Sequence, residues 1–407
     1  MKKKIIIASY IFPPLNSPGS DRVYSFAKYL SEFGHDVIVV TSRQYGDLKY
    51  NFKGFQVLEV GGKNVDNMLS SAKQKPSILL NILRKMAISE VIRLLPFGKI
   101  LRSECRWVES AFVTISELIN NSGCDILITS HPPSETIKLG SKVKVNFPKI
   151  KWVADYRDLF AKNHMTDYYL FVRFFLGMYE KYLIKNADVF IFASKGLLDD
   201  QSFLLPKTIT KRVVYNGFWK ILETPNLNIK SNKIVFVYTG SLYNGSRDID
   251  SLIKLIGSSD RYILNIAVFN QLEKNLIIDL MVKYEVSKRR VNIYVNIFRD
   301  ESIKLQSNAD FLVLLLRKDG KDKAYPTAKL FEYLSLKKPI IGFGSDESEA
   351  SYILKKLEAG VFIEGKDKKN EFFKEWLSKS KMPSNENVHY FSRRNQALEL
   401  ERFILHD

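Results

Sequence analysis

Short apolar runs rich in β-branched residues recur along this chain, and longer helical patterns separate them. The runs are apolar at successive positions, which is typical of parallel strands covered on both faces. Their alternation with helices predicts βαβ units and doubly wound sheets. The strands expected from this pattern are Lys4–Ser9, Asp36–Thr41, Phe55–Val60, Asp125–Thr129, Trp152–Asp155, Val189–Ala193, Arg212–Tyr215, Ile234–Tyr238, Tyr262–Phe269, Val291–Val295, Phe311–Leu316, Pro339–Gly342 and Gly360–Ile363.

Thirteen strands are too many for one such sheet, so the pattern predicts a sheet of seven strands followed by a sheet of six. The stretch 218–232 is polar and lacks a clear period, which is typical of a linker. We therefore expect an N-terminal domain over residues 1–217 and a C-terminal domain over residues 218–384. A last helix, at about 385–407, is expected to pack back on the N-terminal domain. The length of 407 residues agrees with two domains or three.

Composition excludes several classes of protein. Two cysteines and five scattered histidines cannot form a disulfide framework or a zinc cluster, so we expect no metal and a reducing compartment. The apolar run near the N-terminus is too short for a signal peptide, and no other run reaches the roughly 20 residues that span a bilayer. The chain is expected to be cytoplasmic, either soluble or peripheral on a membrane.

The formal net charge of +18 indicates an anionic partner, which could be nucleic acid, a lipid surface or a phosphorylated small molecule. Residues 1–150 carry 21 Lys and Arg against 12 Asp and Glu, so the excess is concentrated in the first third. No nucleic-acid-binding motif and no stripe of alternating basic and aromatic residues accompanies this charge. We therefore rank nucleic acid last among these partners.

The loop after the first strand contains several prolines, and we expect a helix to begin there, capped by Ser20 or Asp21. A helix N-terminus beside Gly19 presents free N–H groups to an anion, and Arg22 adds a full charge. One glycine and one arginine also suit an ordinary βα turn. The sequence leaves both interpretations open.

Two further segments bring polar side chains to the ends of predicted strands. His131 follows the fourth strand, where it is a structural residue or a catalytic one with about equal weight. Asp155 ends the fifth strand and Arg157 follows it, where they form a local salt bridge or bind the hydroxyl groups of an acceptor. Since ligands of doubly wound sheets bind at the carboxyl ends of the strands, all three are candidate site residues.

In the second half, the segment from Tyr238 to Arg247 joins a strand to a helix and contains two glycines. Gly240, followed by Ser241, allows a ligand to approach the backbone closely, and Arg247 could reach a diphosphate.

The strongest signal is AYPTAKLFEYLSLKKPII, residues 324–341. We expect Thr327 to stand at a helix start, so that the N–H groups of Thr327, Ala328 and Lys329 can hold a phosphate beside the ammonium of Lys329. Glu332 lies one turn further on, where its carboxylate can accept two ribose hydroxyl groups. A solvated helix residue is the alternative for Glu332, but its apolar neighbours argue for a largely buried helix.

Two basic and apolar stretches could contact a membrane. Residues 78–102 combine Ile, Leu and Met with five Lys and Arg, a pattern typical of an interfacial helix on anionic lipids. Residues 168–183 are rich in aromatic side chains. Both stretches could instead be core helices with basic flanks. The sequence favours the core interpretation for the second stretch and does not decide for the first.

Together these segments resemble glycosyltransferase family 4 and its relatives. The similarity rests on SYIFPP, GHDVIVVTS, DILITSHPPS, KWVADYRDLF, NADVFIFAS, VVYNGF, VYTGSLY and PTAKLFEYLSLKKPIIGFG, in that order and up to about Gly344. It is greatest to the branch that builds bacterial capsule, O-antigen or exopolysaccharide.

The resemblance implies the GT-B fold, in which two doubly wound Rossmann-like domains face each other across a cleft. It also implies a nucleotide-sugar donor on the C-terminal domain, a UDP- or GDP-sugar that is a substrate rather than a cofactor. The acceptor, a glycan carried on a polyprenyl diphosphate, would bind the N-terminal domain.

The resemblance also implies roles for single residues. Glu332 matches the second Glu of the family's paired-Glu motif, the ribose ligand, and Thr327 to Lys329 match the diphosphate-binding helix start. Arg247 lies near the family's phosphate-binding Lys, His131 matches the His of the cleft, and Gly19 matches the N-terminal glycine loop. Two positions depart from the family pattern: Ala324 stands in place of the first Glu, and Ser241 stands where an Arg often follows the glycine.

The resulting hypothesis is a retaining, metal-independent glycosyltransferase on the inner face of the cytoplasmic membrane. His131, Arg247 and Lys329 are its candidate catalytic residues, and Arg22, Asp155 and Arg157 are its candidate acceptor contacts. Gly19, Gly240, Ser241 and residues 327–329 would hold the nucleotide together with Glu332. Because Ala324 replaces the family's first Glu, a catalytically degenerate partner in polysaccharide assembly is an alternative, and a GT-B sugar-nucleotide epimerase is another.

Overall fold

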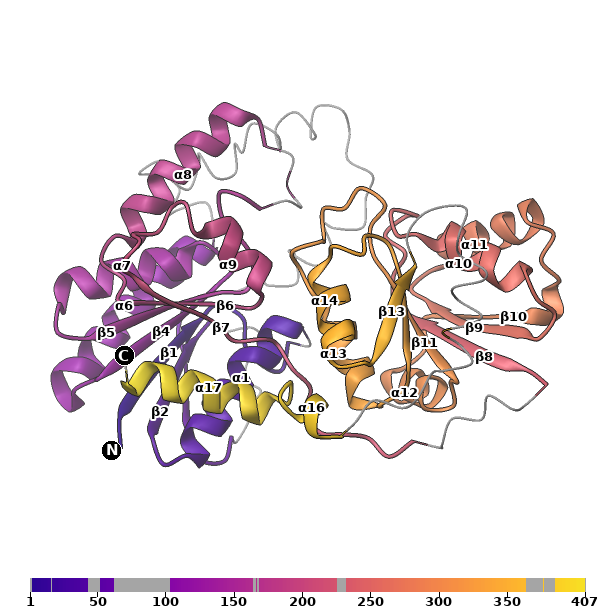
Figure 1. Cartoon of the computed structure of the whole chain (residues 1–407). Helices are drawn as coiled ribbons and strands as arrows, with labels where there is room; N and C mark the ends of the chain where they lie inside the picture. The colour runs from indigo at the N-terminus through magenta and orange to yellow at the C-terminus, as the bar shows by residue number, and fades with distance from the viewer. Residues whose placement is uncertain are drawn as a thin grey trace. The chain divides into compact units, whose positions relative to one another are not determined.

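A computed structural model describes residues 2–15, 17–42, 52–61, 103–163, 166, 168–224, 232–363, 376 and 385–406 (Figure 1). Its contacts divide the chain into two compact units. Unit 1 comprises Met1–Asn216 together with Arg393–Asp407, and unit 2 comprises Gly217–Ser392. Each unit is built around its own parallel sheet, so each has its own core.

The sheet of unit 1 has seven strands in the order β3-β2-β1-β4-β5-β6-β7, and every pair of neighbours is parallel. The central strands are apolar at successive positions and almost fully buried, because helices cover both faces of the sheet (Figure 1). The strands are β1 (Lys4–Ser9), β2 (Asp36–Thr41), β3 (Gln56–Glu59), β4 (Ile126–His131), β5 (Lys151–Tyr156), β6 (Val189–Phe192) and β7 (Thr210–Val213).

Six helices of unit 1 are described, and each lies in a crossover between parallel strands or at the end of the chain. They are α1 (Pro18–Glu32), α6 (Ser103–Ser122), α7 (Glu135–Asn146), α8 (Leu170–Ile184), α9 (Lys195–Gln201) and α17 (Arg393–His406). Helix α17 packs along α1, and α6 packs along α7. The C-terminal helix therefore completes unit 1, where His35 Nε2 lies 2.8 Å from Glu401 Oε1.

Unit 2 contains six parallel strands in the order β10-β9-β8-β11-β12-β13. The strands are β8 (Ile234–Thr239), β9 (Tyr262–Val268), β10 (Val291–Val295), β11 (Phe311–Leu315), β12 (Ile340–Phe343) and β13 (Gly360–Ile363). The described helices are α10 (Ile249–Gly257), α11 (Gln271–Lys283), a 3₁₀ turn (Lys288–Arg290), α12 (Arg299–Ser307), α13 (Ala328–Ser335), α14 (Glu349–Lys356) and α16 (Asn385–His389).

The two doubly wound sheets, with seven and six strands, are confirmed. All thirteen predicted strands are present, with ends that shift by a few residues at most. The predicted cap of the first helix was wrong. The N-cap is Ser17, whose hydroxyl accepts from the Ser20 amide, so that Pro18 occupies the first helical turn, where its missing N–H costs nothing.

One carboxyl group lies within the core of unit 1. Glu180 of α8 is fully buried, and its carboxylate accepts hydrogen bonds from Tyr156 Oη at 2.9 Å, Gln201 Nε2 at 2.6 Å and the Ala161 amide at 3.0 Å. Burial raises the pKa of Glu180 to about 7, although these three donors act to lower it. The carboxyl group thus ties α8 to strand β5 and to the loop that follows it.

We expect this group to make stability depend on pH. Its pKa is higher in the folded chain than in the unfolded one, so the folded state binds the proton more tightly. Glu180 should therefore lower the free energy of unfolding by about 3 kcal/mol as the pH rises from about 4.5 to about 7, and its effect should then level off. Asp158, whose pKa is raised by burial to about 6, acts in the same direction. In urea unfolding across this range, Glu180→Gln should therefore show a smaller fall than wild type, by about this amount, whereas Glu117→Gln on the exposed side of α6 should keep the wild-type fall. Identical pH profiles for the two variants would contradict the assignment.

Candidate functional site

The strand order of unit 2 reverses between β8 and β11, so their carboxyl ends form the switch point at which doubly wound sheets bind ligands. Two loops leave this point: residues 240–248 follow β8, and residues 316–327 follow β11. Backbone hydrogen bonds join the loops, from the Asp248 amide to the Leu316 carbonyl at 3.0 Å and from the Lys318 amide to the Ser246 carbonyl at 2.9 Å. The two loops therefore form one structure.

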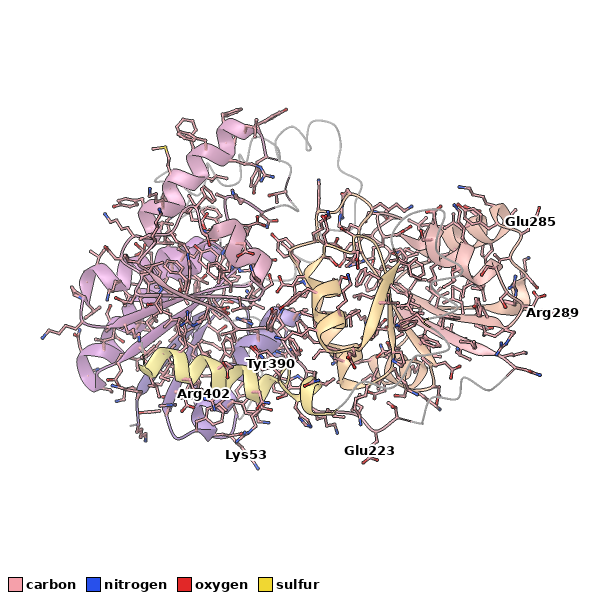
Figure 2. The ribbon with its side chains drawn as sticks, viewed as in Figure 1. Lys53, Glu223, Glu285, Arg289, Tyr390 and Arg402 are labelled. Atoms are coloured by element: carbon pink, nitrogen blue, oxygen red, sulfur yellow. The ribbon has the colours of Figure 1, made fainter. Side chains whose placement is uncertain are left out.

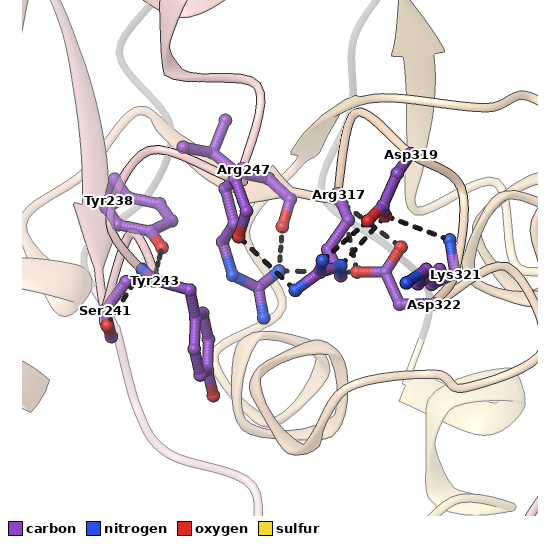
Figure 3. Close-up of polar contacts among 10 residues, drawn as sticks. Tyr238, Ser241, Tyr243, Arg247, Arg317, Asp319, Lys321 and Asp322 are labelled. Atoms are coloured by element: carbon purple, nitrogen blue, oxygen red, sulfur yellow. Dashed lines mark hydrogen bonds and ion pairs between the residues drawn. The ribbon is translucent and has the colours of Figure 1, made fainter. Parts of the chain in front are cut away.

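Arg247 holds this junction together from within (Figure 3). Its Nη1 donates to the Leu315 carbonyl and lies 3.7 Å from Asp322 Oδ2, and the guanidinium lies 5.0 Å from the centre of the Tyr243 ring. The Arg247 Nε atom is buried and has no hydrogen-bond partner among the described residues. The side chain is thus fixed in place with one donor still unused.

Asp322 balances the charge of Arg247. Its side chain is almost fully buried, and its two oxygens each accept from the Arg317 amide at 3.1 Å. Burial raises the pKa of Asp322, although the Arg317 amide and the Arg247 guanidinium act in the opposite direction.

A second ion pair shapes the outer part of the same loop. Arg317 binds Asp319 in a bidentate manner, with Nε–Oδ1 at 2.9 Å and Nη2–Oδ2 at 2.6 Å (Figure 3). Hydrogen bonds from Arg317 lower the pKa of Asp319 to about 2, so this carboxylate stays ionised at neutral pH.

The first turn of the β8 loop depends on one buried carboxylate. Glu273 of α11 accepts from Ser241 Oγ at 2.6 Å, from the Leu242 amide at 2.7 Å and from the Phe269 amide at 3.1 Å. Gly240 has a φ of +145°, and a Cβ there would lie 3.6 Å from Lys329 Cε. A side chain at this position would strain the backbone, although the contact with Lys329 would be an ordinary one.

Glu332 lies on α13 among donors. Its Oε1 accepts from Gln306 Nε2 at 2.8 Å and from Lys329 Nζ at 3.0 Å, and Arg299 Nη2 lies 3.9 Å from Oε2. Burial acts to raise the pKa of Glu332, but Lys329, Gln306 and Arg299 together lower it below its usual value. Glu332 is therefore ionised at neutral pH and remains partly open to solvent.

Helix α13 begins where the sequence predicted. Thr327 is its N-cap residue, but the Thr327 side chain makes no capping bond, and its Oγ1 is buried without a hydrogen-bond partner among the described residues. The first amides of a helix have no partner within the helix, so Thr327, Ala328 and Lys329 present a row of N–H groups. This row, the Lys329 ammonium and Gly240 lie together at the carboxyl edge of the sheet.

In unit 1, two predicted acceptor contacts take on a structural role instead. Arg22 and Asp155 are both fully buried, with Arg22 Nη2 2.8 Å from Asp155 Oδ1 and Arg22 Nε 3.1 Å from both carboxylate oxygens. Ser130 Oγ donates to Asp155 at 2.7 Å, and Arg22 Nη1 donates to the Val214 carbonyl at 2.7 Å. Neither side chain reaches solvent in this structure. Each neutralises the charge of the other inside the core.

Arg157, Gly19 and His131 meet at the carboxyl edge of unit 1. Arg157 Nε donates to the His131 carbonyl at 3.2 Å, and Nη2 donates to the Pro132 carbonyl. Its guanidinium lies where a Cβ of Gly19 would be, 1.3 Å from Nη1, so a side chain at this turn of α1 would displace the Arg157 guanidinium. The His131 ring is almost fully buried and packs beside Tyr156 and Phe160.

The sequence therefore located the carboxyl edges of both sheets, but it missed several residues that hold the site in place through hydrogen bonds. Gln306, Glu273 and Asp322 are polar, buried and central to the site of unit 2. Their positions in α11, α12 and the β11 loop carry no motif, and a carboxylate or amide on a helix predicts solvent exposure more often than burial.

Among the described residues, no helix combines the length and the apolar character that a bilayer span requires. Within the same part of the chain, no three His, Cys, Asp or Glu side chains gather as a possible metal site. The predicted membrane contact at residues 78–102 lies outside the described residues.

Comparisons of sequence found no relative, since no protein-family model and no curated protein matches this chain. Comparison of structures found many. Sucrose-phosphate synthase from Thermosynechococcus elongatus aligns over 99% of this chain and 98% of its own, with 14% identity and a TM-score of 0.64. HepE from Anabaena, in complex with UDP and glucose, aligns over 100% of both chains, with 11% identity and a TM-score of 0.61. The lipopolysaccharide outer core galactosyltransferase WaaB aligns over 98% of this chain and 99% of its own, with 12% identity and a TM-score of 0.62.

These structures are glycosyltransferases of GT-B fold, and the chain described here has that fold. The likeness extends over nearly the whole length of each chain, so it includes both units. At these identities it concerns the fold, and the roles of single residues have to be argued from the geometry of this chain.

The buried ion pair of Arg22 and Asp155 in unit 1 leads to a prediction about stability. Asp155→Asn would leave the Arg22 guanidinium buried without its counter-ion, so we expect a loss of about 3–5 kcal/mol in the free energy of unfolding. Glu32→Gln neutralises an exposed carboxylate, 3.9 Å from Lys28 Nζ, and should cost less than about 1 kcal/mol. Urea unfolding of both variants measures the difference, and equal stabilities would refute the structural role.

Proposed function

We propose that this chain is a glycosyltransferase that binds a nucleotide-sugar donor at the switch point of unit 2. The observation that carries the proposal is the cluster of Glu332, Lys329 and the α13 N-terminus at that point. An ionised carboxylate suits two ribose hydroxyl groups, and a lysine beside free helix amides suits a diphosphate. The complex of HepE with UDP and glucose shows that a protein of this fold binds such compounds.

The ligand-free arrangement is compatible with such binding. Lys329 and Glu332 now pair with each other at 3.0 Å, and both side chains are partly exposed. Such a pair contributes roughly 0–1 kcal/mol, so exchanging it for contacts to a diphosphate and a ribose costs little. Glu332 keeps Gln306 as a second partner, which would hold the carboxylate in position after Lys329 turns to the phosphates.

The proposed chemistry is electrostatic. When the sugar leaves, negative charge develops on the β-phosphate of the departing nucleoside diphosphate. The α13 amides and the guanidinium of Arg247 are in place before the donor binds, and Lys329 turns to the phosphates when it binds, so all three can stabilise this charge during the reaction without further reorganisation. We propose that the acceptor hydroxyl attacks the anomeric carbon on the same face from which the diphosphate departs, as the bond from that carbon to the β-phosphate oxygen breaks. The hydroxyl proton passes to the leaving phosphate, the anomeric configuration is retained, and no metal ion takes part. Arg247 acts from a fixed position, because Asp322 and the Leu315 carbonyl hold it.

The acceptor is proposed to be a glycan on a polyprenyl diphosphate, in capsule, O-antigen or exopolysaccharide synthesis at the inner face of the cytoplasmic membrane. In unit 1, Arg157 and the start of α1 beside Gly19, which lie together at the carboxyl edge, would bind the diphosphate of this acceptor. The galactosyltransferase activity of WaaB in the lipopolysaccharide outer core supports a surface glycan as the product.

Donor binding tests the role of Glu332. In calorimetric titrations with UDP and with GDP, Glu332→Gln should weaken the binding of the preferred nucleotide about tenfold to hundredfold, because bonds to a charged acceptor are lost. Glu347→Gln is the matched control, since Glu347 is exposed and forms an ion pair with Lys323 on the surface of the same unit. Unchanged affinity for the Glu332 variant would remove this residue from the site.

Turnover tests the activity itself. We expect release of nucleoside diphosphate from one of a panel of UDP- and GDP-sugars in the presence of a membrane extract as acceptor. Lys329→Met should lower the rate by about 10²–10³-fold, the usual cost of removing one stabilising donor. Donor binding without release or transfer would favour a non-catalytic assembly partner. Conversion of the donor into an epimer would favour the epimerase, and either result would overturn the proposal.

A further inference from the structure

Helix α8 of unit 1 is apolar on two opposite faces. Its inner face packs in the core through Val172, Leu176 and Leu183. Six large apolar side chains on its other side are exposed, and we call them the outer face of α8: Leu170, Phe171, Phe174, Phe175, Met178 and Tyr182. At 3.6 residues per turn they lie within about 140° of arc. Figure 2 shows side chains standing off this helix.

The exposure of this face is large. Leu170 is 86% exposed, and Phe174 and Phe175 are each 64% exposed. Soluble domains leave single apolar residues on the surface, but six large and exposed apolar side chains on one face of a helix indicate a binding surface. The sequence favoured a core helix over residues 168–183, and the structure shows that only half of α8 is core.

The charge around the outer face is positive. Lys181 and Lys185 lie at its C-terminal end, where Lys185 Nζ is 4.5 Å from the centre of the Tyr182 ring. Within α8, all of which the structure describes, the one acidic residue is Glu180, and it is fully buried in the inner face. This charge would repel the same face of a second copy, whereas anionic headgroups would attract it.

A groove extends the apolar surface beside the helix. It has a volume of about 470 Å³, and its lining includes Phe174, Met178 and Phe203. Basic residues line it as well: Lys162, whose Nζ lies 3.7 Å from the centre of the Phe203 ring, Arg173 and Lys181. An apolar surface with lysine and arginine at its edge matches the acyl and headgroup layers of a bilayer.

We propose that the outer face of α8 docks on an anionic lipid bilayer, lying in the plane of the interface with its aromatic side chains inserted. Basic side chains at the helix end and around the groove contact the headgroups. Arg173 fixes the start of the helix, since its Nη2 donates to the Thr166 carbonyl at 2.6 Å, and Glu180 fixes the other end to Tyr156. The docked surface is thereby joined to strand β5. This proposal does not depend on the proposed function, and it concerns residues other than 78–102.

The first test uses the full chain and vesicles of phosphatidylcholine with or without phosphatidylglycerol. The double variant Phe171→Glu/Phe175→Glu places charges on the outer face, away from the groove. Vesicle flotation should show wild-type chain bound to the anionic vesicles and at least tenfold less of the variant bound. The matched control is Leu272→Glu/Val282→Glu on α11, where both side chains are 72% exposed, and it should bind like wild type.

A second pair of variants tests the preference for anionic lipid. Lys181→Glu/Lys185→Glu should lose binding to the anionic vesicles several-fold, and raising the salt concentration should weaken wild-type binding in the same way. Lys288→Glu/Arg289→Glu changes the charge equally on an exposed turn of unit 2, where Arg289 is labelled in Figure 2, and should bind like wild type. Binding to phosphatidylcholine alone at the same strength would overturn the anionic preference.

Three results would overturn the docking proposal. The first is undiminished flotation of the Phe171 and Phe175 variant, which would assign membrane binding to another part of the chain. The second is a dimer of the wild-type chain in sedimentation velocity, together with a variant that is monomeric but binds vesicles as strongly as wild type. This result would make the outer face a contact between two copies of the chain. The third is absence of wild-type binding to either vesicle. Unchanged thermal unfolding and nucleotide affinity of the variant exclude misfolding as the cause of lost binding.

Discussion

Burial of both faces of a parallel sheet is the constraint on which the rest of this molecule depends. Helices cover the faces of each sheet, so the strands are apolar throughout and polar chemistry is confined to the strand ends. Parallel strands bring their carboxyl ends to one edge, and the reversal of strand order leaves room for a ligand there. Each unit has one such reversal, between β1 and β4 and between β8 and β11.

The two edges use arginine in different ways. In unit 1, Arg22 is neutralised by a fully buried carboxylate and stabilises the core, while Arg157 remains at the edge beside the start of α1. In unit 2, Arg247 is held by Asp322 and a backbone carbonyl, and its buried Nε has no partner in the part of the chain that the structure describes. The high net positive charge of the chain therefore does not mean that every arginine can contact a ligand, because buried carboxylates neutralise some of them.

The proposed donor site and the proposed docking surface lie on different units and have different chemistry. The donor site needs few, fixed charges at the end of a sheet, which a rigid scaffold supplies through Glu273, Gln306 and Asp322. The outer face of α8 needs area and apolar character, which one helix supplies without altering its inner face. Helix α8 can therefore be both a core element and an interaction surface.

Local patterns along the chain were enough to predict the strands, the division into two sheets and the helix start at Thr327, because apolar period and turn chemistry are local properties. They also located the polar residues at strand ends. Which of these residues can reach a ligand depends on the folded chain: Asp155 is enclosed by Arg22 and Ser130, whereas Glu332 is partly exposed to solvent. Burial and pairing depend on residues far away in the chain, such as Gln306 beside Glu332, and so no local pattern can encode them.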